Sequence, residues 1–152
     1  MVDISLLITA INFAFEKHGT TPDKSGFLYV SHVMRVMAMM VDYGLDHMVV
    51  GVLHDVLEET DATAADLMNI GMPKFIIDSV VAITKRKDEP YANYMHRVKS
   101  NFIAFDVKLY ADIVDNTSEY RMKKLPPSMQ KRLRTKYEIA RAILLKDDDE
   151  GS

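Results

Sequence analysis

The amino-acid sequence predicts an all-α protein that folds as a single compact domain, and three observations support this prediction. The chain has 152 residues, a length that fits one domain with a sizeable hydrophobic core. Apolar residues recur at helical spacing along almost the whole chain. The sequence contains no strand-like alternation of apolar and polar residues, no internal repeat and no glycine-rich phosphate loop.

The first two helices are predicted from their apolar residues and from the glycines that follow them. A first amphipathic helix contains Leu6, ends near Gly19 and is followed by a polar loop at 20–26. The stretch 33–41 is apolar nearly all round, which is typical of a buried central helix, and it is expected to stop at Gly44.

The middle of the chain contains three further helix starts. Asp46 is expected to cap the helix that contains the segment GVLHDVLEET. Thr63 and Asp66 resemble a capping box for a short helix, which Gly71 closes. Pro73 opens the next helix, whose inward-facing residues are predicted to be Phe75, Ile76, Val80 and Ile83.

The C-terminal part is predicted to contain three helices. After a charged loop at 85–90, two helices are expected at 91–100 and 102–120. The pair Pro126-Pro127 breaks the chain, and Ser128 is expected to cap a final basic helix that runs to about residue 145.

Composition and charge exclude several classes of protein. With 48% hydrophobic and 27% charged residues, the chain resembles a soluble globular protein, with a domain at 1–146 and an acidic, disordered tail at 147–152. No apolar run approaches the roughly 18 residues of a membrane span, and the N-terminus lacks the basic region of a signal peptide. The absence of cysteine excludes disulfide and thiolate chemistry and is consistent with a cytoplasmic location. The net charge of −3 argues against a broad nucleic-acid surface, so an anionic substrate needs a local basic cluster.

The most informative motif is the run HDVLEE at 54–59. If a helix continues through it, one turn of about 3.6 residues places Glu58 over His54 and Asp55, and places Glu59 over Asp55. An imidazole and three carboxylates without a basic neighbour on that face outline a cation site. The alternative is the solvated face of an amphipathic helix.

Two other residues are candidates for the same site. His32 begins the buried apolar helix, where an unpaired imidazole is costly to desolvate; alternatively, a backbone carbonyl satisfies it. Asp112 has apolar neighbours, with Asp115 and Asn116 on the same helix face; alternatively, it is a surface acid. A divalent-metal site needs nitrogen and oxygen ligands from several elements, because the residues of one helix rarely complete a coordination shell.

Together these residues resemble the HD metal-dependent phosphohydrolase superfamily, whose pattern is H…HD…D on separate helices. Within it, the chain is more similar to the hydrolase domain of the RelA/SpoT family and its small stand-alone members. The matching segments are KSG at 24–26, LYVSHV ending at 33, GVLHDVLEETDAT at 51–63, DSVVAITK at 78–85, and the D-x-x-x-N spacing of Asp112 and Asn116. The resemblance implies an HD-domain helical bundle.

The resemblance also implies a metal site and the residues that act on water. One divalent ion, Mn²⁺ in that family, is expected to be bound by His32, His54, Asp55 and Asp112. The two acidic residues after the HD pair, Glu58 and Glu59, are expected to be catalytic and to handle the attacking water. Glu59 departs from the family, which has aspartate there, and glutamate reaches one methylene further.

The chain departs from the family's pattern at several positions that the resemblance associates with the substrate. Asp23 stands where the family usually has arginine, the family's N-x-R-T run reads NTSE at 116–119, and Tyr110 is an extra residue relative to the usual KLAD. The substrate-binding residues are expected to be Lys24, Ser25, Asn116 and Arg121. Further cations available for phosphate, each of which is alternatively a solvated surface charge, are Arg86, Lys87 and Lys124.

The resemblance therefore implies Mn²⁺-dependent hydrolysis of the 3′-pyrophosphate of guanosine tetra- or pentaphosphate, nucleotides of the stringent response. The products are GDP or GTP and pyrophosphate. Two alternatives stay open, namely an HD-type hydrolase of another nucleotide and a non-catalytic nucleotide-binding regulator. The expected partner is a small nucleotide rather than a nucleic acid or a membrane, and a homo-oligomer is compatible with the sequence.

Overall fold

The computed structural model describes residues 2–147, and these fold as one compact all-α domain, as predicted. Within this range, strand-like pairing is limited to an isolated bridge between Pro22 and Leu28. None of the described helices combines the length and the apolar character that a bilayer crossing requires. The predicted acidic tail at 147–152 lies outside the described residues apart from Asp147.

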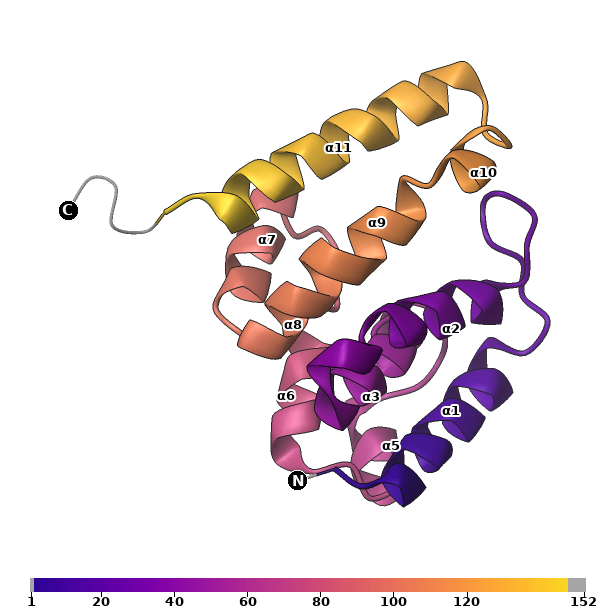
Figure 1. Cartoon of the computed structure of the whole chain (residues 1–152), viewed down its shortest axis with the longest axis vertical. Helices are drawn as coiled ribbons and strands as arrows, with labels where there is room; N and C mark the ends of the chain where they lie inside the picture. Colours follow the sequence, from indigo (N-terminus) through magenta and orange to yellow (C-terminus); the bar gives the residue numbers. More distant parts are fainter. Residues whose placement is uncertain (1, 148–152) are drawn as a thin grey trace.

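Three helices that pack on one another begin the chain (Figure 1). α1 (Ile4–His18) is capped by Asp3, whose carboxylate accepts the backbone N–H of Leu6. α2 (Tyr29–Met39) begins earlier than the predicted apolar stretch, and a 3₁₀ turn, η1 (Val41–Tyr43), leads from it into α3 (Leu45–Leu53).

The start of α3 differs from the prediction. Gly44, with a φ of 107°, occupies the N-cap position, and no side chain caps the helix. Asp46 lies inside the first turn instead, where its carboxylate accepts the backbone N–H of Val2 at 3.3 Å. The predicted cap is therefore wrong, although the negative charge of Asp46 still suits the positive end of the helix dipole.

The prediction of one continuous helix through HDVLEE is also wrong. His54 and Asp55 form a turn between α3 and α4 (Val56–Glu59). The imidazole Nδ1 of His54 lies 2.7 Å from the carbonyl oxygen of Gly51. In an uninterrupted α-helix that carbonyl accepts the backbone N–H of Asp55. Competition by the side chain for this acceptor favours the turn at the His-Asp pair.

The two helices that follow agree with the prediction in their caps. α5 (Ala64–Asn69) has the predicted capping box of Thr63 and Asp66. α6 (Lys74–Ala82) follows Pro73, which takes the N-cap position. The prediction that Phe75 faces inward is wrong, because the buried face of α6 follows the helical spacing of Ile76, Val80 and Ile83, and Phe75 lies off this stripe with 38% of its surface exposed.

The single helix predicted at 102–120 is interrupted twice. After α7 (Tyr91–Lys99), the chain forms α8 (Phe102–Val107), a π-helical turn and α9 (Ile113–Asn116), and then turns into α10 (Glu119–Met122). The π turn, η2 (Lys108–Asp112), contains the extra residue Tyr110. A π turn accommodates an additional residue within a helix. Tyr110 is 46% exposed while Asp112 remains buried.

The last helix, α11 (Pro127–Leu145), lies along the upper edge of the molecule and packs on α7 (Figure 1). Its first position is Pro127, a residue that suits this place because its missing N–H has no helical partner there. Ser128 therefore lies inside the helix, and the prediction that it caps the helix is wrong.

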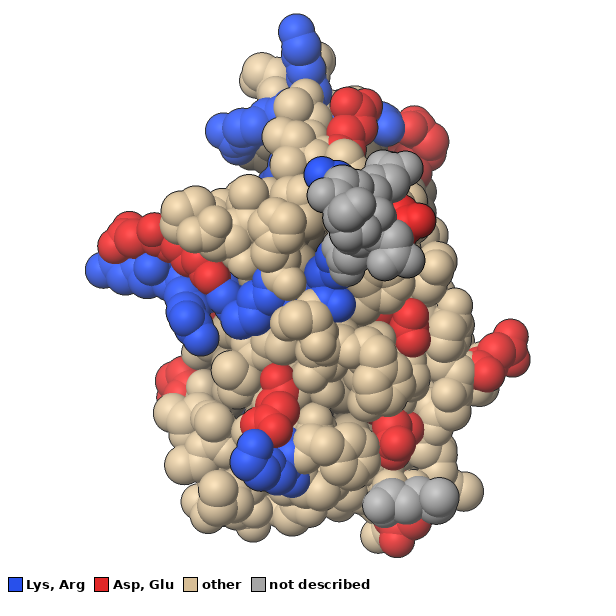
Figure 2. Space-filling view, turned by 90° about the vertical axis from the view of Figure 1, so that its left-hand side faces the viewer, with Lys and Arg blue, Asp and Glu red and all other residues tan. Residues whose placement is uncertain are grey.

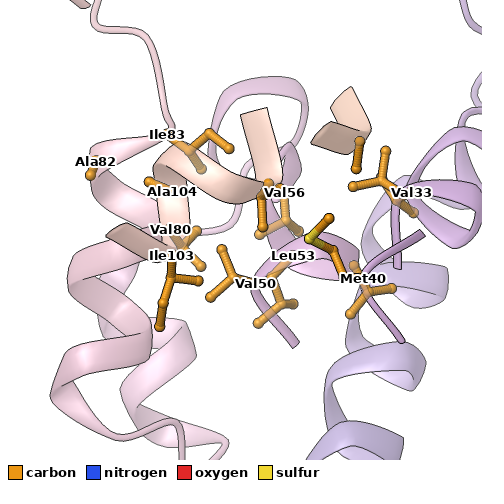
Figure 3. Packing of buried hydrophobic residues seen from close by; sticks show 14 of the residues in the cluster. Val33, Met40, Val50, Leu53, Val56, Val80, Ala82, Ile83, Ile103 and Ala104 are labelled. Carbon is orange, nitrogen blue, oxygen red and sulfur yellow. The ribbon is translucent and has the colours of Figure 1, made fainter. Parts of the chain in front are cut away.

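α3 is the central helix of the core. It packs against α1, α2, α6 and α8. Figure 3 shows Val50 and Leu53 of α3 between Val80 and Ile103 on one side and Met40 on the other, and all five side chains are almost fully buried. This packing holds the C-terminal end of α3, and with it the His-Asp turn, in one position.

Gly51 allows α3 to approach α2 closely, and we expect G51A to destabilise the protein. A Cβ atom at this position would lie 3.2 Å from the Cα atom of Met37, a backbone atom that cannot rotate away. Overpacking costs about 1–3 kcal/mol, which outweighs the roughly 1 kcal/mol that alanine contributes in helix propensity. Urea unfolding measures the change. The control variant K74A, on an exposed part of α6, should change the free energy of unfolding by less than about 0.5 kcal/mol, and an equally stable G51A would contradict the expectation.

Candidate metal centre

The four predicted metal ligands converge in the structure. His32 comes from α2, His54 and Asp55 from the turn after α3, and Asp112 from η2. The two histidine Nε2 atoms lie 3.2 Å apart, and Oδ1 of Asp112 lies 3.1 Å from each of them. Oδ2 of Asp55 lies 3.3 Å from His32 Nε2 and 3.1 Å from His54 Nε2. One ligand atom of each residue therefore faces a common centre.

The opposite nitrogen of each imidazole is bonded to an acceptor. Nδ1 of His32 lies 2.7 Å from Oδ2 of Asp115, and Nδ1 of His54 lies 2.7 Å from the carbonyl oxygen of Gly51. Both acceptors require a proton on Nδ1, so each Nε2 presents a lone pair to the centre in the neutral ring. This is the tautomer that ligates a metal ion.

The separations fit a single divalent ion. Bonds of about 2.0–2.2 Å from a metal to nitrogen or oxygen place neighbouring ligand atoms roughly 3.0–3.5 Å apart. The distances between the nitrogen and oxygen atoms of the cluster, 3.1–3.3 Å, fall in this range. Imidazole nitrogen combined with carboxylate oxygen is a donor set for first-row divalent metals rather than for a soft ion.

The electrostatics of the cluster attract positive charge. Burial alone would lower the pKa of His54, but Asp55 and Asp112 outweigh it and raise the pKa to about 9. Burial alone would raise the pKa of Asp55, but His54 and His32 hold it well below its usual range. The same holds for the pKa of Asp112, which Lys108 and His54 lower against the effect of burial. A bound cation can supply this positive charge in place of protons.

Three further side chains hold the two carboxylates. The hydroxyl of Tyr29 donates to Oδ2 of Asp55 at 2.8 Å. Lys108 Nζ lies 2.8 Å from Oδ2 of Asp112, and the amide of Asn116 donates to Oδ1 of Asp112 at 3.0 Å. Asn116, predicted as a substrate contact, thus orients a carboxylate of the cluster. Sequence reasoning missed Lys108, whose four-residue spacing to Asp112 was a usable signal.

Asp115, also missed as a functional residue, links the cluster to two arginines. Its carboxylate contacts His32 Nδ1, accepts from Nε of Arg35 at 2.7 Å and accepts from Nη1 of Arg121 at 2.9 Å. His32 and Arg35 outweigh the effect of burial and lower the pKa of Asp115 to about 2. Asp115 is therefore ionised and orients the His32 ring.

We expect D115N to weaken metal binding by roughly 10–100-fold, the usual cost of removing a carboxylate that orients a metal-ligating histidine. The amide can no longer serve as a charged acceptor for His32 Nδ1, and Arg35 loses its ion-pair partner. Calorimetric titration with Mn²⁺ measures the effect. The exposed acid Asp42 offers a matched control, since D42N should bind the ion as the wild type does. Equal affinities in D115N and the wild type would contradict the role of Asp115.

A cavity of about 230 Å³ adjoins the cluster, with Asp55 and Asp112 in its wall. Glu58 and Glu59, the predicted catalytic acids, also line it. Oε1 of Glu58 accepts the backbone N–H of Lys85 at 2.9 Å, which orients this carboxylate. Burial raises the pKa of Glu58, and burial together with the charge of Asp55 raises the pKa of Glu59. Both carboxylates are thus more basic than ordinary surface acids.

The predicted substrate contacts all reach the cavity, but they differ in what they bind. Lys24, Ser25, Asn116 and Arg121 line it, whereas Arg86, Lys87 and Lys124 do not. Ser25 donates its hydroxyl to the carbonyl oxygen of Arg121 at 3.0 Å. The guanidinium of Arg121 is occupied by Asp115 and by Asp23, whose Oδ2 lies 2.9 Å from Nη2. Asp23, which stands where the resemblance leads one to expect an arginine, therefore forms an ion pair with Arg121.

Several residues of the cavity wall had no signal in the sequence. These are Tyr91 and Tyr94 of α7, and Lys136 and Tyr137 of α11. Figure 2 shows Lys and Arg side chains gathered in the upper half of one face, at the height of α7 and α11 in Figure 1, although the chain has a net charge of −3. The local basic cluster that an anionic substrate requires consists of the cations that line the cavity: Lys24, Lys85, Lys108, Arg121 and Lys136.

A histidine, a His-Asp pair and an aspartate from separate elements meet in this all-α fold, which is the arrangement that the resemblance to HD domains implies. No protein-family model matches the chain. A probable guanosine-3′,5′-bis(diphosphate) 3′-pyrophosphohydrolase of Mycoplasma pneumoniae is 34% identical over 88 residues, which are 57% of this chain and 12% of that protein. A protein of Aquifex aeolicus with the same name, without "probable", is 38% identical over 60 residues, 38% of this chain and 9% of that protein.

The similarity to a solved structure extends over nearly the whole fold. A structure described as a metazoan ortholog of SpoT that hydrolyzes ppGpp matches with a TM-score of 0.78 at 20% identity, over 95% of this chain and 88% of that chain. The chain is therefore similar in sequence to these pyrophosphohydrolases over part of its length, and its fold is similar to that of the SpoT ortholog. It spans no more than 12% of the length of the curated relatives described above.

Proposed function

We propose that this protein is a Mn²⁺-dependent phosphohydrolase that removes the 3′-pyrophosphate of guanosine tetra- or pentaphosphate and releases GDP or GTP. The observation that supports this most directly is the convergence of two imidazoles and two carboxylates beside a cavity whose wall contains both carboxylates and several lysines. The names of the curated relatives and the description of the similar structure support the choice of substrate.

In this proposal each part of the site has one role. His32, His54, Asp55 and Asp112 hold the ion. When bound, the ion would polarise a phosphoryl oxygen and lower the pKa of a water molecule. Glu58 accepts the proton of the attacking water, because it lines the same cavity and its carboxylate is held by the Lys85 N–H. Glu59, beside it, adds negative charge that favours the same proton transfer.

The phosphate groups need positioning and neutralisation rather than covalent catalysis. Lys24 lines the cavity as an exposed cation, and Lys108 lines it while it is paired with Asp112. Ser25 and Arg121 tie the loop that contains Lys24 to the segment after α9. This tie keeps the Lys24 loop at the mouth of the cavity.

The proposal is tested by incubating the purified protein with guanosine tetraphosphate and measuring released pyrophosphate. We expect release that stops after chelation and is restored best by Mn²⁺ in a series of divalent ions. An active hydrolase of this type serves as a positive control. Absence of pyrophosphate release while the control enzyme is active would rule out the proposed substrate. Full activity after chelation would rule out a requirement for a metal ion.

A second candidate is the hydrolysis of another nucleotide by the same site. It is favoured by the Asp23–Arg121 ion pair, because this pair occupies the guanidinium of Arg121 and leaves it less available to a phosphate group of the nucleotide. A panel of 5′-monophosphates, 3′-phosphorylated adenosine compounds and guanosine tetraphosphate separates the candidates by their kcat/KM values. Binding without turnover of any compound would instead indicate a nucleotide-binding regulator.

A further inference from the structure

The cations of the cavity differ in whether they already have an anionic partner. Lys108 is paired with Asp112, and Arg121 is paired with Asp23 and Asp115. The Nζ atom of Lys85 lies 3.3 Å from the carbonyl oxygen of Arg86. Among the described residues that line the cavity, this leaves Lys24 and Lys136 as the cations without such a contact, and Lys24 is exposed at the surface.

Lys136 is held in place by aromatic rings rather than by an acid. It lies on α11, and its Nζ is 5.1 Å from the centre of the Tyr91 ring and 5.4 Å from that of Tyr137. Contacts of this kind hold an ammonium group without neutralising it. The side chain is only partly exposed, so its charge is partly desolvated. A cation held at the wall of a cavity without an acid is suited to bind an anionic ligand.

The positive charges around Lys136 also favour the binding of an anion. Burial, together with the positive charges of Lys108 and Lys24, lowers the pKa of Lys136. Like charges gathered around one cavity repel one another, and an anion bound between them relieves this repulsion. A phosphate group supplies both the charge and several acceptor oxygens.

We propose that Lys136 is a substrate-binding residue that holds a phosphate group of the nucleotide by a charge-assisted hydrogen bond from Nζ. The inference rests on the proposed function for the identity of the nucleotide. It differs from the contacts inferred from the sequence, which lie in the loop at 24–26 and after η2, because α11 supplies the residue from the other end of the chain.

The experiment compares four proteins: the wild type, K136Q, K136R and K131Q. Lys131 lies on the same helix but is exposed and does not line the cavity, so K131Q is the matched control. Inorganic pyrophosphate is titrated into each protein in a calorimeter, and KM and kcat are measured with guanosine tetraphosphate. Thermal unfolding of each variant reports whether the substitution disturbs the fold.

Because a hydrogen bond to a charged group is worth about 1.5–3 kcal/mol, K136Q should bind pyrophosphate roughly 10–100-fold more weakly. Its KM should rise by a similar factor with kcat nearly unchanged. K136R keeps the charge and should retain most of the affinity, and K131Q should match the wild type. Equal binding by K136Q and the wild type, or no binding by the wild type, would overturn the inference.

The same experiment separates this inference from the proposed function. In one outcome, K136Q loses pyrophosphate binding and the wild type does not turn over guanosine tetraphosphate. This result would support the role of Lys136 and rule out the proposed substrate. In the other outcome, the wild type turns over guanosine tetraphosphate and K136Q has an unchanged KM. This result would support the proposed substrate and rule out the role of Lys136. If K136Q unfolds at a lower temperature, the comparison of K136R with K131Q still decides, because loss of pyrophosphate binding in K136R at native stability would contradict a role that depends on the charge.

Discussion

D112N is expected to abolish hydrolysis, with a loss on the order of a thousandfold or more, since the ion supplies several kcal/mol of transition-state stabilisation. Oδ1 of Asp112 lies 3.1 Å from both histidine Nε2 atoms, so the substitution removes one of the two carboxylates of the proposed metal site. Calorimetric titration with Mn²⁺ and release of pyrophosphate measure the two losses. Metal affinity and activity equal to those of the wild type would contradict the site.

The same substitution is expected to destabilise the fold, because Asp112 also neutralises the buried Lys108. Breaking one partner of a buried ion pair typically costs about 3–5 kcal/mol. The double variant K108M/D112N provides the control: it removes both charges and should recover most of the free energy of unfolding while remaining inactive. If stability and activity return together, the loss in D112N is one of folding rather than of metal binding. H54A offers an independent test, since it removes a ligand and leaves the Lys108–Asp112 ion pair in place.

E58Q is expected to lower kcat by roughly 10²–10⁴-fold, the usual contribution of a general base, while metal binding stays unchanged. Glutamine keeps the shape of the side chain and can still accept the Lys85 N–H, but it cannot take a proton from water. Measurement of kcat and of Mn²⁺ affinity in the same preparation separates the two effects. A variant with normal kcat would contradict the assignment of Glu58 as the base.

The pH profile gives a second measurement for Glu58. Burial raises the pKa of its carboxyl above the ordinary value. The base must be ionised, so the rate of the wild type should fall as the pH decreases through this raised pKa, and E58Q should lack that decrease. E59Q should have a smaller effect on kcat, because among the described residues no hydrogen bond orients the Glu59 carboxylate, whereas the Lys85 N–H orients that of Glu58. If E59D conferred activity on an inert wild type, a non-catalytic regulator would become the better assignment.

Much of the fold could be predicted from local patterns. The spacing of apolar residues correctly predicted an all-α fold. The Thr63–Asp66 capping box is present as expected, because both partners lie within one helical turn. Predictions failed where a side chain competes with the backbone or where a distant residue is the partner. Gly51 accepts from the His54 side chain, so the helix ends there, and Asp46 binds the N–H of Val2 instead of capping its own helix.

The candidate site shows the same division. The residue types of the cluster were readable from the motif, and their convergence is a property of the structure. The partner of Arg121 was not readable, since Asp23 lies almost a hundred positions away along the chain and pairs with it through space. Neither was the place of Lys136, because a basic helix face does not reveal which of its lysines turns toward a cavity.

By itself, the sequence determined an all-α chain and the set of imidazoles and carboxylates that can ligate a metal ion, because helical periodicity and side-chain chemistry are local properties. Only the tertiary structure decided which cations remain available to an anion. Charge pairing depends on distances of about 3 Å between segments that are remote in the chain. The packing of α3 against its neighbours and of α11 against α7 sets those distances.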